Sequence, residues 1–188
     1  MGQPDLACFE PAFADELADI MRWAFTYIQA DKGGAVYLRL STRTIDQPSR
    51  IIDKALSADI LAGGYWLQRP LKKDSGVIIY MGAVATEAIA AQAEIKNMGV
   101  IAVTSADQLY KDWRKNGREA HISNLLGLID RDAPVVTVID GHPATLSWIG
   151  SVRGNRVWPL GVEDFGQCGS VEELYNTYGI GKNAIINT

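Results

Sequence analysis

Two residues that could exchange protons follow one of the apolar runs of this chain. Asp140 and His142 stand just after Val135–Ile139, separated from each other by Gly141. In an open α/β sheet, ligands bind beyond the carboxyl ends of strands, where a carboxylate and an imidazole could work as an acid/base pair. The alternative is structural, because short acidic side chains before a helix commonly cap it, and His142 would then sit at a domain contact. The pattern leaves both roles open.

Two arginines form a second candidate group near the N-terminus. Arg39 and Arg43 flank Ser41 and Thr42 at the end of the apolar segment Ala35–Leu40. Two guanidinium groups near a strand end suit a phosphate or a carboxylate. Arginines are also common in interfaces, so a salt-bridged domain boundary is the alternative.

The chain has two cysteines, Cys8 and Cys168, which lie far apart and follow no metal-ligand spacing. We expect two separate thiols in a reducing compartment. Cys168 stands two residues before a predicted helix that begins at Ser170, and a thiol near a helix N-terminus can become a nucleophile through a lowered pKa. No histidine is adjacent in sequence, which favours a structural role for the loop Glu163–Cys168.

Composition excludes several classes of protein. Of the 188 residues, 47% are hydrophobic and 21% are charged, as in ordinary soluble globular proteins. The net charge of -4 argues against a general nucleic-acid binder, which needs a basic surface. The N-terminus shows no secretory leader, and the longest apolar stretch, Val77–Ala85, is too short to span a bilayer. We therefore expect a cytoplasmic protein with neither a nucleic-acid nor a membrane partner.

The nucleotide-binding motifs of parallel sheets are also missing. The turn after Val77–Met81 contains one glycine, Gly82, where the dinucleotide fingerprint needs several. The nearest lysine-serine grouping, Lys73–Ser75, precedes that strand, whereas a P-loop follows one.

The first part of the chain predicts a helix over Glu10–Ala30 and a strand over Ala35–Leu40. Apolar residues recur along the helix at three- and four-residue steps. One helix and one strand cannot close a core, so residues 1–48 are interpreted as the tail of another domain followed by the polar linker Ser41–Pro48.

The rest of the chain, residues 49–188, predicts a single α/β domain. Short strands are expected at Tyr65–Leu67, Val77–Met81, Val100–Thr104, Val135–Ile139 and Val157–Leu160. The helices expected before, between and after them are Ser49–Leu61, Thr86–Asn97, Ser105–Lys115, His121–Ile129, Pro143–Val152 and Ser170–Tyr178. Continuous apolar strands that alternate with helices are typical of a parallel sheet covered on both faces, a three-layer α/β/α architecture.

Several segments resemble transketolase-like enzymes. In Pro159–Ile180, a Phe-Gly loop leads into a helix of the family's Leu-x-x-x-Phe/Tyr-Gly form, with Cys168 where the family usually has Ser. Glu10–Ala12 and Gly34–Ser41 resemble the end of the family's pyrimidine-binding domain, and the resemblance covers nearly the whole chain. Gly99–Ser105 and Asp140–Trp148 are most similar to the homodimeric pyruvate dehydrogenase branch.

The resemblance implies a five-stranded C-terminal domain in which Tyr65–Leu67 is the one antiparallel strand. It implies a homodimeric parent enzyme that uses thiamine diphosphate and Mg²⁺ on 2-oxo acids or ketose phosphates. The family's Gly-Asp-Gly…Asn motif and cofactor-activating glutamate are absent here, so they are expected in upstream catalytic domains. The family's phosphate-holding arginine aligns with Thr42 or Arg43. Asp46–Gln47 stand where pyruvate-specific members have a histidine before the linker proline.

These observations give a leading hypothesis and two alternatives. The leading one is the C-terminal, mainly structural and dimerising region of a pyruvate dehydrogenase-like decarboxylating component, whose partner would be a lipoyl acyltransferase. Alone, the region is expected to bind no cofactor and to have no activity. The substrate-entrance candidates are Arg39, Ser41, Arg43, Asp140, His142 and Cys168. The alternatives are the C-terminal region of a transketolase that transfers two-carbon units and a stand-alone interaction domain.

Overall fold

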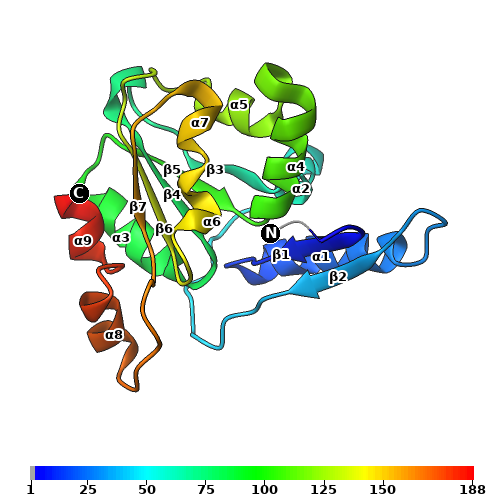
Figure 1. Ribbon diagram of the computed structural model, residues 1–188, viewed down its shortest axis with the longest axis horizontal. Coiled ribbons are helices and arrows are strands. Elements are labelled where there is room, and N and C mark those ends of the chain that lie inside the picture. Colours follow the sequence, from blue (N-terminus) through cyan, green and yellow to red (C-terminus); the bar gives the residue numbers. More distant parts are fainter. Residues whose placement is uncertain (1–2) are drawn as a thin grey trace.

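A five-stranded sheet forms the centre of the computed structural model, which describes residues 3–188 (Figure 1). The strands, in the order β3-β5-β4-β6-β7, are Gly64–Gln68, Gly99–Val103, Val77–Met81, Val135–Ile139 and Val157–Leu160. Only β3 runs antiparallel to its neighbour in this sheet, pairing with β5. The α/β prediction, including the antiparallel strand over Tyr65–Leu67, is therefore confirmed.

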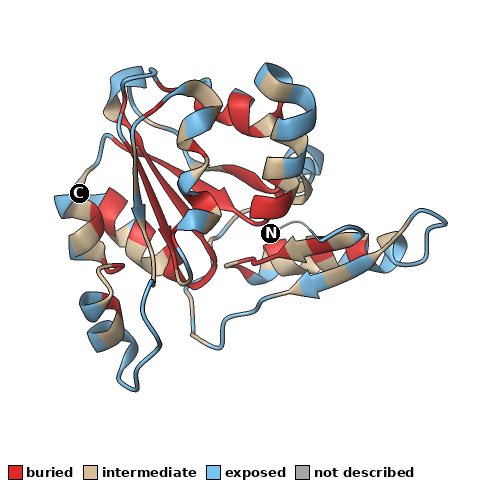
Figure 2. Ribbon diagram, in the orientation of Figure 1, coloured by how far each residue is buried: buried red, intermediate tan, exposed pale blue. Residues whose placement is uncertain are grey.

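Helices cover both faces of this sheet. One face packs against α3 (Ala85–Glu94), α8 (Val171–Thr177) and α9 (Lys182–Asn187), and the other against α4 (Ala106–Asn116), α5 (His121–Leu126), α6 (Ala144–Ser147) and α7 (Gly150–Arg153). Side chains alternate between the two faces along each strand, so Ile78 and Tyr80 join one core cluster while Val77 and Ile79 join the other. Figure 2 shows the central strands buried throughout.

The N-terminal segment forms a separate small layer beside the sheet. It consists of β1 (Leu6–Phe9), α1 (Ala14–Tyr27) and β2 (Ala35–Leu38), and the two strands pair in parallel. We define β1, α1 and β2 as the N-terminal unit. It extends from the edge of the main sheet, and a linker leads from it into α2 (Lys54–Ala62) (Figure 1). The sequence did not predict β1, because four residues are too few to show a periodic pattern.

A buried carboxylate joins this unit to the main sheet. The Glu16 side chain is 1% exposed and accepts hydrogen bonds from the backbone N–H groups of Ala12 and Phe13, at 2.7 and 2.9 Å. The Tyr65 hydroxyl, on β3, donates to its other oxygen at 2.5 Å. Arg50 of the linker donates to Tyr65 at 2.7 Å. Helix α1, the linker and β3 are therefore held at one point.

Several helices differ from their predicted bounds. Helix α2 begins at Lys54 instead of Ser49, because the Asp53 side chain caps it by accepting the Leu56 N–H. Helices α3 and α5 each end three residues earlier than predicted. Helix α1 begins at Ala14 instead of Glu10, because Phe13 is the extended N-cap residue that Glu16 satisfies. Pro143–Val152 forms two short helices instead of one. They meet near Gly150, where a Cβ would lie 2.8 Å from the side chain of Val157, so this turn packs directly on β7. Helix α9 was not predicted.

None of the helices among residues 3–188 is long and apolar enough to cross a membrane.

Replacing Tyr65 by Phe tests the connection through Glu16. The change leaves a buried carboxylate with one partner fewer, so the free energy of unfolding should fall by about 1–3 kcal/mol in urea titrations. Tyr37→Phe is the matched control, since Tyr37 is 54% exposed and should change stability by less than about 0.5 kcal/mol. Equal effects of both variants would show that the Glu16 contact does not hold the unit in place.

Candidate substrate entrance at the carboxyl edge

The candidate site lies where the strand order of the main sheet reverses. The chain passes from β4 to β5 on one side and then to β6 on the other, so the carboxyl ends of β4 and β6 flank a switch point. Ligands of open α/β sheets bind at such points. Gly82 follows β4 here, and Asp140 follows β6. The end of β1 meets this edge too, because the N–H of Glu10 donates to the Thr104 carbonyl at 2.8 Å.

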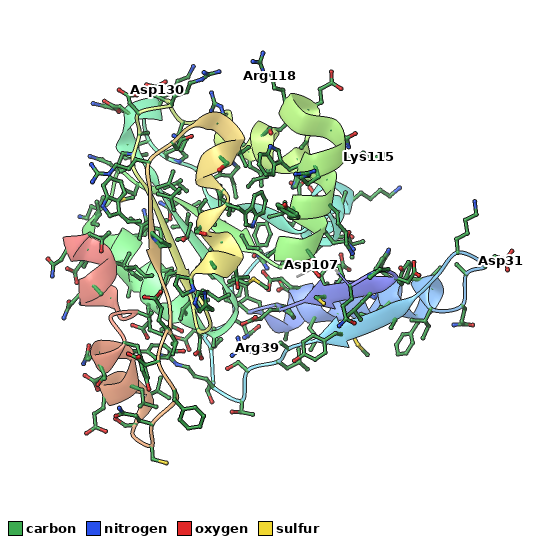
Figure 3. All side chains as sticks on the ribbon, in the orientation of Figure 1. Asp31, Arg39, Asp107, Lys115, Arg118 and Asp130 are labelled. Carbon is green, nitrogen blue, oxygen red and sulfur yellow. The ribbon has the colours of Figure 1, made fainter. Side chains whose placement is uncertain are left out.

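The Glu10 side chain fills the space beside Gly82. A Cβ on Gly82 would lie 2.1 Å from the Oε1 of Glu10, and the φ of Gly82 is 69°, a backbone conformation that favours glycine. The same Oε1 accepts a hydrogen bond from Arg39 at 2.6 Å. Figure 3 shows Arg39 where the N-terminal unit meets the main domain. Glu10, Arg39 and Gly82 therefore form one contact between three strand ends.

Burial decides the protonation of Glu10. Loss of water raises the pKa of this carboxyl to about 7, and the negative charge of Asp140 acts in the same direction. The Arg39 guanidinium lowers the pKa, but burial outweighs it. Glu10 is thus a carboxyl group that changes charge near neutral pH at the mouth of the sheet, a property common among functional acids and bases.

Arg43 lines the same cavity as Asp140 and is held by two neighbours. Its Nη2 donates to the Oε1 of Glu87, on α3, at 2.9 Å. Its guanidinium lies 5.4 Å from the ring centre of Tyr175, on α8. The Tyr175 hydroxyl donates to the Oδ2 of Asp140 at 3.3 Å, and burial, aided by Asp140, raises the pKa of Tyr175 to about 12. Linker, α3, α8 and β6 are therefore connected through polar side chains.

A cavity of about 290 Å³ opens between these groups. Ser41, Thr42 and Arg43 line it from the linker, Asp140 from β6, and Gly166 and Gln167 from the loop that precedes α8. Tyr178 fixes this loop, since its hydroxyl donates to the Phe165 carbonyl and accepts from the Gln167 N–H. The cavity is large enough for a small metabolite, and its walls combine hydroxyl groups, one carboxylate and apolar side chains.

The structure brings together some of the predicted residues and leaves others apart. Arg43, Ser41 and Asp140 line the cavity, whereas Arg39 is not among the lining residues and bonds to Glu10. His142 is exposed, and its Nδ1 accepts the Ala144 N–H at 3.2 Å, so it has a capping contact. The interpretation of Asp140 as the helix cap was wrong, because Asp140 bonds to Tyr175 instead. Cys168 is an exposed free thiol on the loop, and Cys8 is also free.

Three contributors were missed by reasoning from the sequence. Glu87 and Tyr175 lie on helices far along the chain, and no local pattern links them to Arg43. One weak sequence pattern could have indicated Glu10 as a residue at a strand end. It follows the short apolar run Leu6–Phe9, just as Asp140 follows Val135–Ile139.

The residues around this cavity do not fit a metal-diphosphate group. In the described part of the chain, no three His, Cys, Asp or Glu side chains are grouped as metal ligands. Both nearby arginines are already paired with carboxylates. We therefore assign no contact with such a group to these residues.

Comparisons with known proteins identify the architecture. No protein-family model matches the sequence, and no curated protein matches it. Among solved structures, transketolase from Leishmania mexicana superposes with a TM-score of 0.70 at 16% identity, over 98% of this chain and 24% of that chain. This chain has a transketolase-like fold.

Other transketolase structures agree with this fold. Transketolase from Campylobacter jejuni subsp. jejuni gives a TM-score of 0.66 at 16% identity, over 98% of this chain and 26% of that one. A split-gene transketolase, described as an inactive beta4 tetramer, gives 0.64 at 19% identity, over 98% of this chain and 56% of that one. The chain thus spans about a quarter of two of these transketolases and 56% of the third.

Glu10 should make stability depend on pH. Its pKa is raised on folding, so its favourable contribution is complete below about pH 4.5 and is lost as pH rises through about 7. The loss is on the order of 2–3 kcal/mol. Glu10→Gln removes the titrating group, so its free energy of unfolding should fall less than that of the native chain between about pH 5 and 8 in urea titrations. Identical pH slopes for the two proteins would contradict the role assigned to burial.

Proposed function

We propose that this chain is the C-terminal region of a thiamine diphosphate-dependent enzyme that decarboxylates a 2-oxo acid, as pyruvate dehydrogenase does. In this proposal, the cofactor and Mg²⁺ are held by upstream catalytic domains in the cytoplasm. The acyl group passes to the lipoyl group of an acyltransferase component. The chain itself stabilises the assembly, and its cavity at Ser41–Arg43 and Asp140 forms part of the substrate entrance.

The pairing of both entrance arginines supports a 2-oxo acid over a sugar phosphate. Arg39 is bound to Glu10 at 2.6 Å and Arg43 to Glu87 at 2.9 Å. A phosphate dianion would have to displace a carboxylate from one of these guanidinium groups and would also meet Asp140. A short 2-oxo acid needs no anion site for its far end, so arginines that already have partners do not disfavour it.

The N-terminal unit supports the need for further domains. Two parallel strands under one helix are far from a stable sheet, because parallel sheets are normally larger and covered on both faces. The similar split-gene transketolase indicates that a transketolase-like enzyme can be encoded in separate pieces. We infer that this chain associates with the catalytic domains of its parent enzyme.

Transketolase activity is the second candidate, because all the solved structures compared above are transketolases. The two can be separated by combining the chain with its parent catalytic domains, thiamine diphosphate and Mg²⁺. Release of CO₂ from pyruvate is then compared with consumption of xylulose 5-phosphate. Pyruvate turnover with an inert sugar phosphate would support the proposal, and the reverse result would establish the transketolase alternative.

Replacing Glu87 by Gln tests the charge argument on the isolated chain. The change removes the carboxylate that neutralises Arg43, so inorganic phosphate should bind at least about tenfold more tightly, as measured by calorimetry. Glu94→Gln is the matched control, because Glu94 is on the same helix and pairs with the exposed Lys182 at 2.6 Å. If the native chain already binds phosphate as well as Glu87→Gln does, the neutralised arginines do not exclude it.

A further inference from the structure

Phe165 is the most exposed large apolar side chain that the structure describes, with 96% of its surface in water. It stands in the loop between β7 and α8, which extends away from the main domain in Figure 1. A Cβ placed on the next residue, Gly166, would meet nothing within 4 Å, so the loop reaches into open space. Single apolar side chains are common on protein surfaces and need no explanation by themselves. Phe165 differs from them in how its loop is held and in where it lies.

The backbone on both sides of Phe165 is fixed. The Tyr178 hydroxyl, at the C-terminal end of α8, donates to the Phe165 carbonyl at 3.0 Å and accepts from the Gln167 N–H at 3.1 Å. Ser170 and Glu173 form a capping box that fixes the start of the helix. The exposed ring is therefore presented by an ordered loop, so a partner loses little entropy in holding it.

The loop is part of the rim of the cavity of about 290 Å³ at the carboxyl edge. Gly166 and Gln167, both exposed, line this cavity, and Val171 lines it from the first turn of α8. Val171 is 44% exposed, so it adds apolar surface next to the loop. The residues described around this cavity do not fit a metal-diphosphate group, so in the proposed enzyme the domains that hold the cofactor close over this rim.

Acidic side chains flank the exposed ring in sequence. Glu163 and Asp164 precede Phe165 in the loop, and Glu172 stands in the first turn of α8. All three acids are exposed, and none of them belongs to an ion pair among residues 3–188. An aromatic side chain beside unpaired carboxylates fits a pocket that is apolar inside and carries Lys or Arg at its rim.

We propose that Phe165 is the anchor by which this chain docks on the catalytic domains of its parent enzyme, in an apolar pocket with a basic rim. The inference rests on the proposed function, because it takes those domains as the partner. Strand β1 ends at the same carboxyl edge, where the N–H of Glu10 bonds to the Thr104 carbonyl. Domains that continue the N-terminal unit therefore start from the edge on which the loop lies.

Calorimetry of the native chain and of Phe165→Ala with the separately supplied catalytic domains tests the anchor. Removing the ring should weaken the association by at least about tenfold, because buried aromatic side chains dominate such contacts. The thermal unfolding midpoint of the isolated variant should equal that of the native chain, since the ring is 96% exposed there.

Leu71→Ala is the matched control. Leu71 is 70% exposed and also lies in a loop, but that loop precedes β4 at the opposite, amino edge of the sheet. The control should leave the association unchanged. A loss of affinity as large as that of Phe165→Ala would show that exposed apolar side chains contribute wherever they lie, which would overturn the proposal.

Tyr178→Phe tests the ordered loop while the ring of Phe165 stays in place. The change removes both hydrogen bonds that hold the loop, so the association should weaken by about threefold or more. Equal affinities of the native chain and Phe165→Ala, or no association of the native chain, would overturn the docking contact. Turnover of xylulose 5-phosphate but not pyruvate by the native complex would overturn the proposed function and leave the contact standing.

Discussion

The placement of the N-terminal unit depends on one buried carboxylate. Glu16 accepts two backbone N–H groups at the start of α1 and the hydroxyl of Tyr65 on β3. Burial raises the pKa of Glu16, while its hydrogen bonds and the nearby Arg50 oppose that rise. A buried polar group is tolerated only when its partners are in place, so this position of α1 is strongly selected over alternatives.

The position of α1 in turn sets the geometry of the carboxyl edge. Strand β1 ends where Glu10 reaches Gly82, and β2 ends where Arg39 reaches Glu10. The linker then brings Arg43 to Glu87 and under Tyr175. A shift of the unit by one residue would move the Glu10 side chain away from the space beside Gly82. The geometry of this edge is therefore a consequence of how the two parts of the chain dock, with Arg39 paired to Glu10 and Arg43 to Glu87.

The sequence was most informative about the main sheet. Val77–Met81 and Val135–Ile139 were predicted at their observed bounds, and Ser105 caps α4 as expected. These segments are buried on both faces, so their apolar character is continuous and easily recognised. The site was predicted only in part. Asp140 and Arg43 do line one cavity, and their role as substrate-entrance residues stays a prediction, while their contacts with Tyr175 and Glu87 were not foreseen.

The sequence by itself determined the fold class, because local patterns of apolar residues, caps and turns are properties of neighbouring residues. Tertiary structure alone decided which charges meet. Glu10 and Arg39 lie 29 residues apart, Arg43 and Glu87 lie 44 apart, and Tyr65 is 49 from Glu16. Such contacts depend on how separate elements pack, and no spacing along the chain encodes them. The same packing decided that one side of α1, with Ile20 and Ala24, is buried while Phe25 remains exposed.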